Sequence, residues 1–136
     1  MVSLQHLGDK VVRIDFQFDA YTDEALESFK NALLLVYALP DVPVVLVLDL
    51  THLPAWPPWD FIYDIAQFLR EHQADIAMAV EFSMIIIDSP VLQQAVEGLF
   101  LLVPPQRPVY FHTETPPDCL DSVRKYRQNK ATCPHL

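Results

Sequence analysis

The stretch that decides the fold runs from Val42 to Trp59 and reads VPVVLVLDLTHLPAWPPW. Its first part, Val44 to Leu48, is apolar without alternation, which is typical of a strand covered on both faces in a parallel sheet. The strand ends on Asp49, and a loop rich in proline and tryptophan then leads into a helix. In open α/β sheets, ligands and partners are usually bound just beyond the carboxyl ends of the strands. We therefore expect a central strand here and a functional surface in the segment that follows it.

The segments before this strand predict a hairpin and a helix. Apolar and polar residues alternate from Val11 to Phe18, and Leu4 to Leu7 precede a turn signal at Gly8 and Asp9. Thr22 is expected to cap a helix, because two acidic residues and an apolar stripe at helical spacing follow it.

The segments after it predict further pairs of strand and helix. The periodicities favour a helix over Asp60 to Gln73, a strand over Phe82 to Ile87, a helix capped by Ser89, a strand over Pro108 to His112, and a last helix opened by a capping box at Thr115 to Asp118. The fold class is therefore α/β, with a mostly parallel sheet of about four or five strands flanked by about four helices.

Length and composition limit the classes of function. The chain has 136 residues, which suits one domain over 1–130 with a short tail at 131–136. Its net charge of −9 argues against nucleic acid as a partner, because binding phosphates needs a basic face. No apolar run is long enough to span a bilayer, and the first residues do not read as an export signal, so we expect a soluble, cytoplasmic protein. Two cysteines imply neither a disulfide framework nor a zinc site, and we expect no metal and no cofactor.

Several of these segments resemble STAS domains, which share the SpoIIAA-like fold. The opening strand, turn and helix of that family are similar to two consecutive segments of this chain, Gly8 to Phe16 and Phe18 to Thr22. Val45 to Leu50 resembles its "VVLDLS" strand, with Thr51 where serine usually stands. The resemblance implies a small regulatory or scaffolding module that binds a protein partner. The phosphorylatable serine of the family falls near Pro58 or Trp59 here, so the resemblance does not imply the usual phosphorylation switch.

The later part of the chain is similar to the related CRAL-TRIO domains, which bind lipids. The similarity covers Phe68 to His72, Phe82 to Pro90 (FSMIIIDSP) and Arg107 to Phe111. It implies a cavity large enough for a lipid or another small molecule. Binding of such a ligand is the alternative to the STAS-like interaction module.

The Pro/Trp loop is the partner-binding segment that the sequence favours, and it comprises Trp56, Pro57, Pro58 and Trp59. Rigid tryptophans are common at interface hot spots, so the loop suits a protein partner or self-association, for example in a homodimer. The competing interpretation is a hydrophobic lid over the end of the sheet. We expect at least one of the two tryptophans to fold back in this way.

Polar residues at the ends of the predicted strands form a second candidate site, made of Asp49, Thr51, Asp88 and His112. Asp49 also resembles the phosphoacceptor of receiver domains, but the acidic pair and the lysine that such domains need are missing. No strained nucleophile turn and no glycine-rich phosphate loop are present either. We therefore expect no catalytic residues, an enzyme being the third alternative, and predict that Asp49 accepts a hydrogen bond from the backbone that follows it.

Overall fold

The computed structural model describes residues 2–40, 42–114 and 119–132. This part of the chain forms five strands and five helices. In chain order they are β1 (Val2–Gly8), β2 (Val11–Gln17), α1 (Asp23–Tyr37), β3 (Val44–His52), α2 (Trp59–Glu71), α3 (Gln73–Ala79), β4 (Val80–Ile86), α4 (Pro90–Leu102), β5 (Val109–His112) and α5 (Cys119–Thr132). The expected α/β class is confirmed, with five helices where about four were predicted.

The first two strands form the predicted hairpin. β1 pairs antiparallel with β2, and the turn between them has positive φ at Gly8 (90°), Asp9 (51°) and Lys10 (59°). Glycine adopts such angles without steric cost and aspartate tolerates them better than most residues, which is why the Gly-Asp pair signals this turn.

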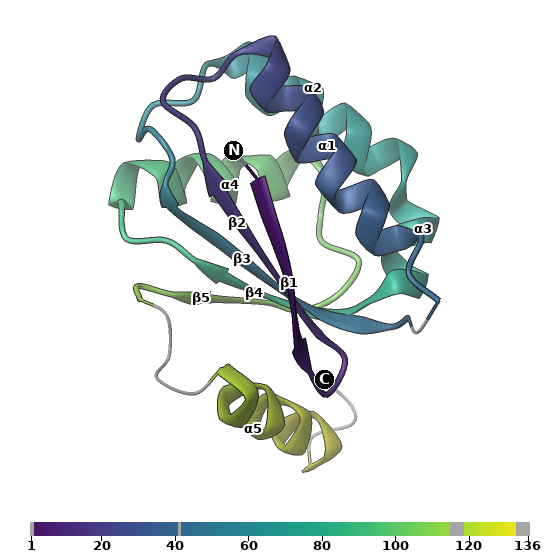
Figure 1. Ribbon diagram of the computed structural model, residues 1–136. Coiled ribbons are helices and arrows are strands. Elements are labelled where there is room, and N and C mark those ends of the chain that lie inside the picture. The colour runs from purple at the N-terminus through teal and green to yellow at the C-terminus, as the bar shows by residue number, and fades with distance from the viewer. Residues whose placement is uncertain (1, 41, 115–118, 133–136) are drawn as a thin grey trace.

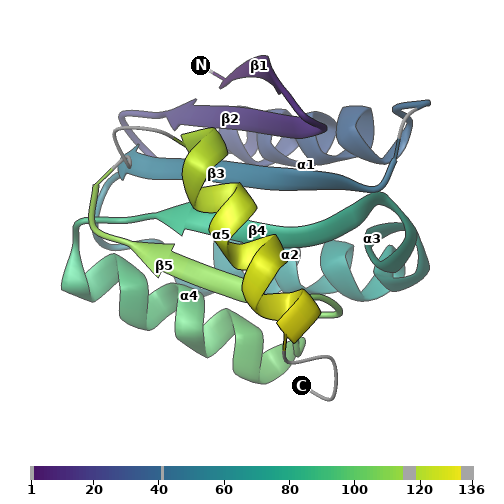
Figure 2. The same cartoon turned by 90° about the horizontal axis from the view of Figure 1, so that it is seen from below.

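The sheet has the strand order β1-β2-β3-β4-β5, and β2 to β5 are parallel. Because each parallel strand lies next to the one before it in the chain, right-handed crossovers place every connecting helix on the same face. Figure 1 shows α1, α2, α3 and α4 together above the sheet, while α5 lies alone below it. Seen from below, α5 crosses the middle strands diagonally (Figure 2). We call these two faces the four-helix face and the α5 face.

The core is divided by the sheet. Alternate residues of the strands point to the four-helix face, where Ile14, Phe16, Leu46 and Ile85 pack with α1 to α4. The α5 face carries its own cluster, in which Val123 of α5 is fully buried against strand residues. The strands Val44–His52 and Val80–Ile86 are thus covered on both sides, as the apolar run Val44 to Leu48 and the nearly unbroken apolar run Phe82 to Ile87 predicted.

Two helix starts follow the predicted capping chemistry. The Thr22 hydroxyl accepts a hydrogen bond from the N–H of Ala25 (3.1 Å), and the Ser89 hydroxyl accepts one from Leu92 (3.2 Å). Each bond satisfies a backbone donor that the first turn of a helix leaves free. The capping box predicted at residues 115–118 lies outside the described residues, as do residues 133–136 of the predicted tail.

The predicted single helix over Asp60 to Gln73 is wrong in one respect. α2 ends at Glu71, His72 leaves the helical region (φ −112°, ψ 22°), and a separate helix α3 follows. The imidazole of His72 meets Asp75 at 2.9 Å across this junction. The change of direction lets Ile76 pack on the main core and brings the chain to the start of β4 (Figure 1). Periodicity within one segment carries no information about where the next strand must begin.

Candidate functional site

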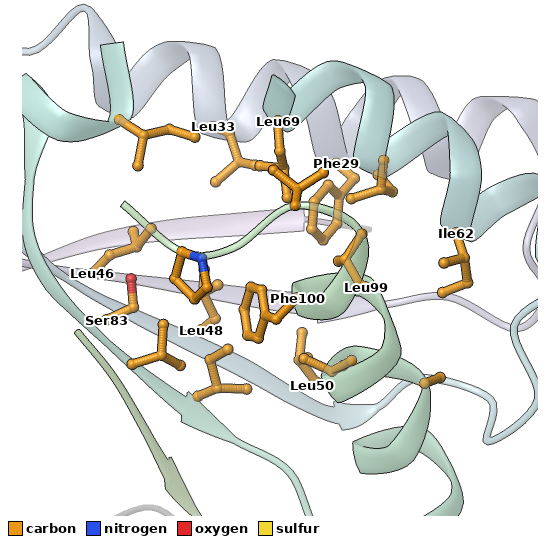
Figure 3. A pocket seen from close by; sticks show the side chains of 18 of the residues that line it. Phe29, Leu33, Leu46, Leu48, Leu50, Ile62, Leu69, Ser83, Leu99 and Phe100 are labelled. Atoms are coloured by element: carbon orange, nitrogen blue, oxygen red, sulfur yellow. The ribbon is translucent and has the colours of Figure 1, made fainter. Parts of the chain in front are cut away.

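A cavity lies between the sheet and the helices of the four-helix face. Its volume is about 160 Å³, and most of its lining side chains are apolar. The floor comes from β3 and β4, and the roof comes from α1, α2 and α4. Figure 3 shows Leu46, Leu48 and Leu50 following one another along the floor, with Leu33, Leu69, Phe29 and Ile62 above them and Leu99 and Phe100 at the side.

The residues that line the cavity extend along the strands. Leu46 and Leu50 lie four residues apart on β3, a distance of about 13 Å at the rise of a strand. On the roof, Ile62, Ile65 and Leu69 line it from three successive turns of α2. The cavity, with a volume of about 160 Å³, thus has lining residues on both its floor and its roof along this length.

One end of the cavity lies at the carboxyl edge of the sheet. Its lining residues are half-buried: Tyr21, Leu53, Pro57 and Phe61. The Tyr21 hydroxyl donates to the carbonyl of Pro54, and its ring meets Phe61 edge-on at 4.7 Å. Burial raises the pKa of Tyr21 to about 12, so the hydroxyl stays protonated and remains a donor at neutral pH. This hydrogen bond ties the Pro/Trp loop across the end of the cavity.

The other end, at the amino edge of the sheet, is open and more polar. The segment from Pro104 to Arg107 joins α4 to β5, lines the cavity and is exposed throughout. Gln73 at the start of α3 and Ser83 on β4 also line this end. We call this opening the Arg107 mouth. It is the part of the cavity that solvent reaches most directly.

The Pro/Trp loop does not form the lid that we expected. Trp56 is 79% exposed and Trp59 is 68% exposed, so neither ring folds back over the sheet. Only Pro57 of this loop and Leu53 before it line the cavity. Tyr21 and Phe61 already fill the apolar space at this end, which leaves both indole rings outside. Trp59 contacts the equally external Tyr63, with ring centroids 6.0 Å apart.

Asp49 is the buried charged residue of the described chain, and it lies on the α5 face, opposite the cavity. Its carboxylate accepts hydrogen bonds from the N–H and the hydroxyl of Thr51 (2.9 and 2.6 Å) and from Arg13 (2.7 Å). The predicted bond to the following backbone is thus confirmed, with Thr51 still inside β3. Arg13 also binds Asp15 at 2.9 Å.

The neighbours of Asp49 hold its carboxylate in the ionised form, as expected for an anion with a structural role. Burial acts to raise its pKa, but the two hydrogen bonds from Thr51 and the charge of Arg13 outweigh burial, and the net effect is a lowered pKa. A carboxylate held ionised in this way is a poor general acid or base at neutral pH. Its contacts account for its burial without a ligand.

The four predicted strand-end residues do not come together. Asp49 and Thr51 are in contact, but in the sheet register Ile86 lies between Asp49 and His112. Two strand spacings, about 10 Å, therefore separate the two strands that carry Asp49 and His112. His112 instead shares a hydrogen bond of 2.8 Å with the Tyr126 hydroxyl of α5. Asp88 is exposed beyond the end of β4.

The residues that shape the cavity were missed by the sequence interpretation. Ser83 had a signal, because it is the polar residue in the otherwise apolar run Phe82 to Ile87. Arg107 and Tyr21 had none, because their roles depend on which segments the fold brings to each end of the cavity.

Comparisons with family models, with curated proteins and with solved structures give no significant match for this chain. Within the described ranges, no three histidine, cysteine or acidic side chains are close enough to hold a metal ion. None of the helices in the described part of the chain combines the length and the apolar character needed to cross a membrane.

Proposed function

We propose that the protein binds a small apolar or amphiphilic ligand in the cavity between the sheet and the four-helix face. The observation that supports this proposal is the cavity itself, about 160 Å³ of mainly apolar space. Protein cores are normally packed to the density of organic crystals, with few voids larger than a water molecule. The cavity is open at the Arg107 mouth, so part of its apolar lining is in contact with water. A ligand that covers this apolar surface is stabilised by the hydrophobic effect.

The volume indicates the size of the ligand. An engineered cavity of about 150 Å³ in another protein, lined by similar side chains, binds benzene. The ligand therefore has about six to ten carbon atoms, and we take it to be a chain that runs between the lining residues of β3 and α2. This is the small-molecule alternative implied by the resemblance to CRAL-TRIO domains, with a ligand smaller than a membrane lipid.

Replacing Val96 with phenylalanine tests the proposal. Val96 lines the cavity from α4, so a larger side chain occupies the empty space. We expect Val96→Phe to weaken binding of octan-1-ol at least tenfold in isothermal titration calorimetry. The free energy of unfolding is expected to stay unchanged or to rise by up to about 1 kcal/mol, because filling a cavity stabilises a core.

The matched control is Val47→Phe, the same change at a fully buried residue of the α5 face. That part of the core has no space for the phenylalanine ring, so overpacking is expected to lower the free energy of unfolding by about 1–3 kcal/mol. Binding of octan-1-ol is expected to be retained. Unaltered binding in Val96→Phe would contradict the proposal. Native mass spectrometry of the protein isolated from its own cells would report a retained ligand directly.

A second candidate function is self-association through the Pro/Trp loop, the role that the STAS resemblance implies for an interaction module. The exposure of Trp56 and Trp59 favours it, because two rigid aromatic rings outside the core are typical of an interface centre. In a twofold dimer the same loop would meet itself.

The double variant Trp56→Ser/Trp59→Ser tests this candidate. We expect the dissociation constant of the dimer, measured by sedimentation equilibrium, to rise tenfold or more, with an unchanged circular dichroism spectrum. Leu101→Ser is the control, since Leu101 is 85% exposed on α4, away from the loop. A wild-type protein that remains monomeric at high concentration would exclude self-association.

A further inference from the structure

The polar groups of the cavity are gathered at the Arg107 mouth. The middle of the cavity is lined by leucine, isoleucine, valine and phenylalanine side chains, whereas Gln73, Ser83, Gln106 and Arg107 line the mouth end. A ligand that fills this space therefore meets hydrocarbon along most of its length and hydrogen-bond donors at one end. The position of the polar groups at one end therefore indicates the chemical class of the ligand in the proposed function.

Ser83 belongs to this end and has its hydroxyl available. Its side chain is half-buried on the cavity floor, where Figure 3 shows it beside Leu46 and Leu48. Its backbone N–H donates to the carbonyl of Pro108 (2.9 Å), which places it next to the chain segment that carries Arg107. The structure shows no hydrogen bond from the Ser83 hydroxyl to another described residue, and no fully buried polar side-chain atom in that part of the chain lacks a partner, so this hydroxyl is accessible. It can therefore bind a polar atom of a ligand without breaking an existing bond.

Arg107 is held in place by hydrogen bonds, but no carboxylate of the described residues neutralises its charge. Its Nε and Nη2 groups both donate to the carbonyl of Ala77 (3.0 and 2.6 Å), which fixes the guanidinium at the mouth. A guanidinium has five N–H donors, so others stay available for a ligand.

Arg107 has no carboxylate partner among the described residues, although the chain is acidic. The sequence has 18 acidic residues and 9 basic ones. Arg13, Arg124 and Arg127 each meet a carboxylate within 3.0 Å. In the part of the chain that the structure describes, Arg107 has no such partner. Arg70 likewise binds a carbonyl, that of Leu102 (3.3 Å), and has no carboxylate partner there. An anion supplied by a ligand would give Arg107 the kind of partner that Arg13, Arg124 and Arg127 have.

We infer that the ligand is a carboxylate with a medium-length hydrocarbon chain, bound with its chain along the cavity and its carboxylate at the Arg107 mouth. This inference rests on the proposed function. Gln73, Gln106 and Ser83 line the same end of the cavity as Arg107 and are neutral, so Arg107 is the one of these four residues that carries a charge to pair with a carboxylate. A carboxylate accepts hydrogen bonds from an arginine in the same plane, which gives the pair a defined geometry.

Two ligands of equal chain length, octanoate and octan-1-ol, separate the contribution of the charge from that of the chain. In isothermal titration calorimetry at low salt, we expect the wild-type protein to bind octanoate about fivefold more tightly than octan-1-ol. The factor is modest because Arg107 is exposed, and exposed ion pairs contribute at most about 1 kcal/mol. Raising the salt from low to physiological concentration is expected to weaken octanoate binding and to leave octan-1-ol binding unaffected.

The variants assign the effect to one residue. Arg107→Gln is expected to bind both ligands equally and to lose the salt dependence, while Arg107→Lys retains most of the preference for octanoate. Arg124→Gln removes the same charge on the α5 face, where Arg124 pairs with Asp9, and is expected to behave as the wild type. Thermal unfolding of each variant checks that the fold is intact.

The outcomes distinguish this inference from the proposed function. Equal binding of octanoate and octan-1-ol by the wild type, or an Arg107→Gln variant that keeps the preference, would overturn the carboxylate while leaving the apolar site in place. Binding of neither ligand would overturn both.

Discussion

Replacing Val123 with aspartate is expected to lower the free energy of unfolding by at least about 3 kcal/mol, because it buries a carboxylate without a partner. Val123 is fully buried in the cluster of the α5 face. The alternative to burying the charge is to release α5 from the sheet. That release also breaks the contact of Tyr126, whose ring stacks on Tyr110 with centroids 4.0 Å apart and meets Phe82 edge-on.

Urea denaturation measures the loss of stability in Val123→Asp, and amide hydrogen exchange reports whether α5 is released. We expect the amides of α5 to exchange faster than those of β3 and β4, together with increased binding of a hydrophobic dye to the uncovered strands. The matched control is Gln128→Asp, which adds the same charge at an exposed position of the same helix. Unchanged stability and unchanged exchange in Val123→Asp would show that α5 does not depend on this contact.

Replacing Asp49 with asparagine is expected to lower the free energy of unfolding by about 2–3 kcal/mol at neutral pH. This loss of stability is smaller than the loss expected when a buried charge keeps no partner, because Arg13 still binds Asp15 in the variant. The contribution of Asp49 to stability also depends on pH. The pKa of Asp49 is lowered in the folded protein, so the unfolded chain binds the proton more readily. The stabilisation is therefore present above the unfolded pKa, about 3.9, and is lost as the pH falls through the folded value.

Unfolding experiments from neutral pH down to about pH 2.5 test this expectation. The difference in stability between the wild type and Asp49→Asn is expected to be largest at neutral pH and to shrink in acid. Asp88→Asn is the control, since Asp88 is exposed and is expected to contribute little at any pH. A difference that stays constant with pH would mean that Asp49 acts through packing and not through its charge.

The elements that the sequence predicted are those whose signals are local. The turn at Gly8 and Asp9 needs positive φ angles, the caps at Thr22 and Ser89 need a side-chain oxygen three residues before a free N–H, and a doubly covered strand needs an unbroken apolar run. Each of these conditions involves neighbouring residues. The hairpin, the helix starts, the strand at Val44 and the backbone bond of Asp49 are correct for that reason.

The candidate site depends on contacts between distant segments, and the sequence did not predict its position or the residues that line it. The cavity exists because side chains from β3, α2 and α4 leave space between them, and no periodicity measures that space. Trp56 is exposed because the rings of Tyr21 and Phe61 occupy the apolar space at the carboxyl end of the sheet. Arg107 gains its role from the carbonyl of Ala77, 30 residues earlier in the chain.

The single-sided arrangement of α1 to α4 also determines when the fold can be completed during synthesis. A chain that folds as it emerges from the ribosome assembles its earlier segments first. All five strands and the helices of the four-helix face precede α5 in the chain, so the sheet can form with its second face still in water (Figure 2). That face carries Phe82, Met84 and Ile86, and it stays open to chaperones or to another nascent chain until Cys119–Thr132 has been made.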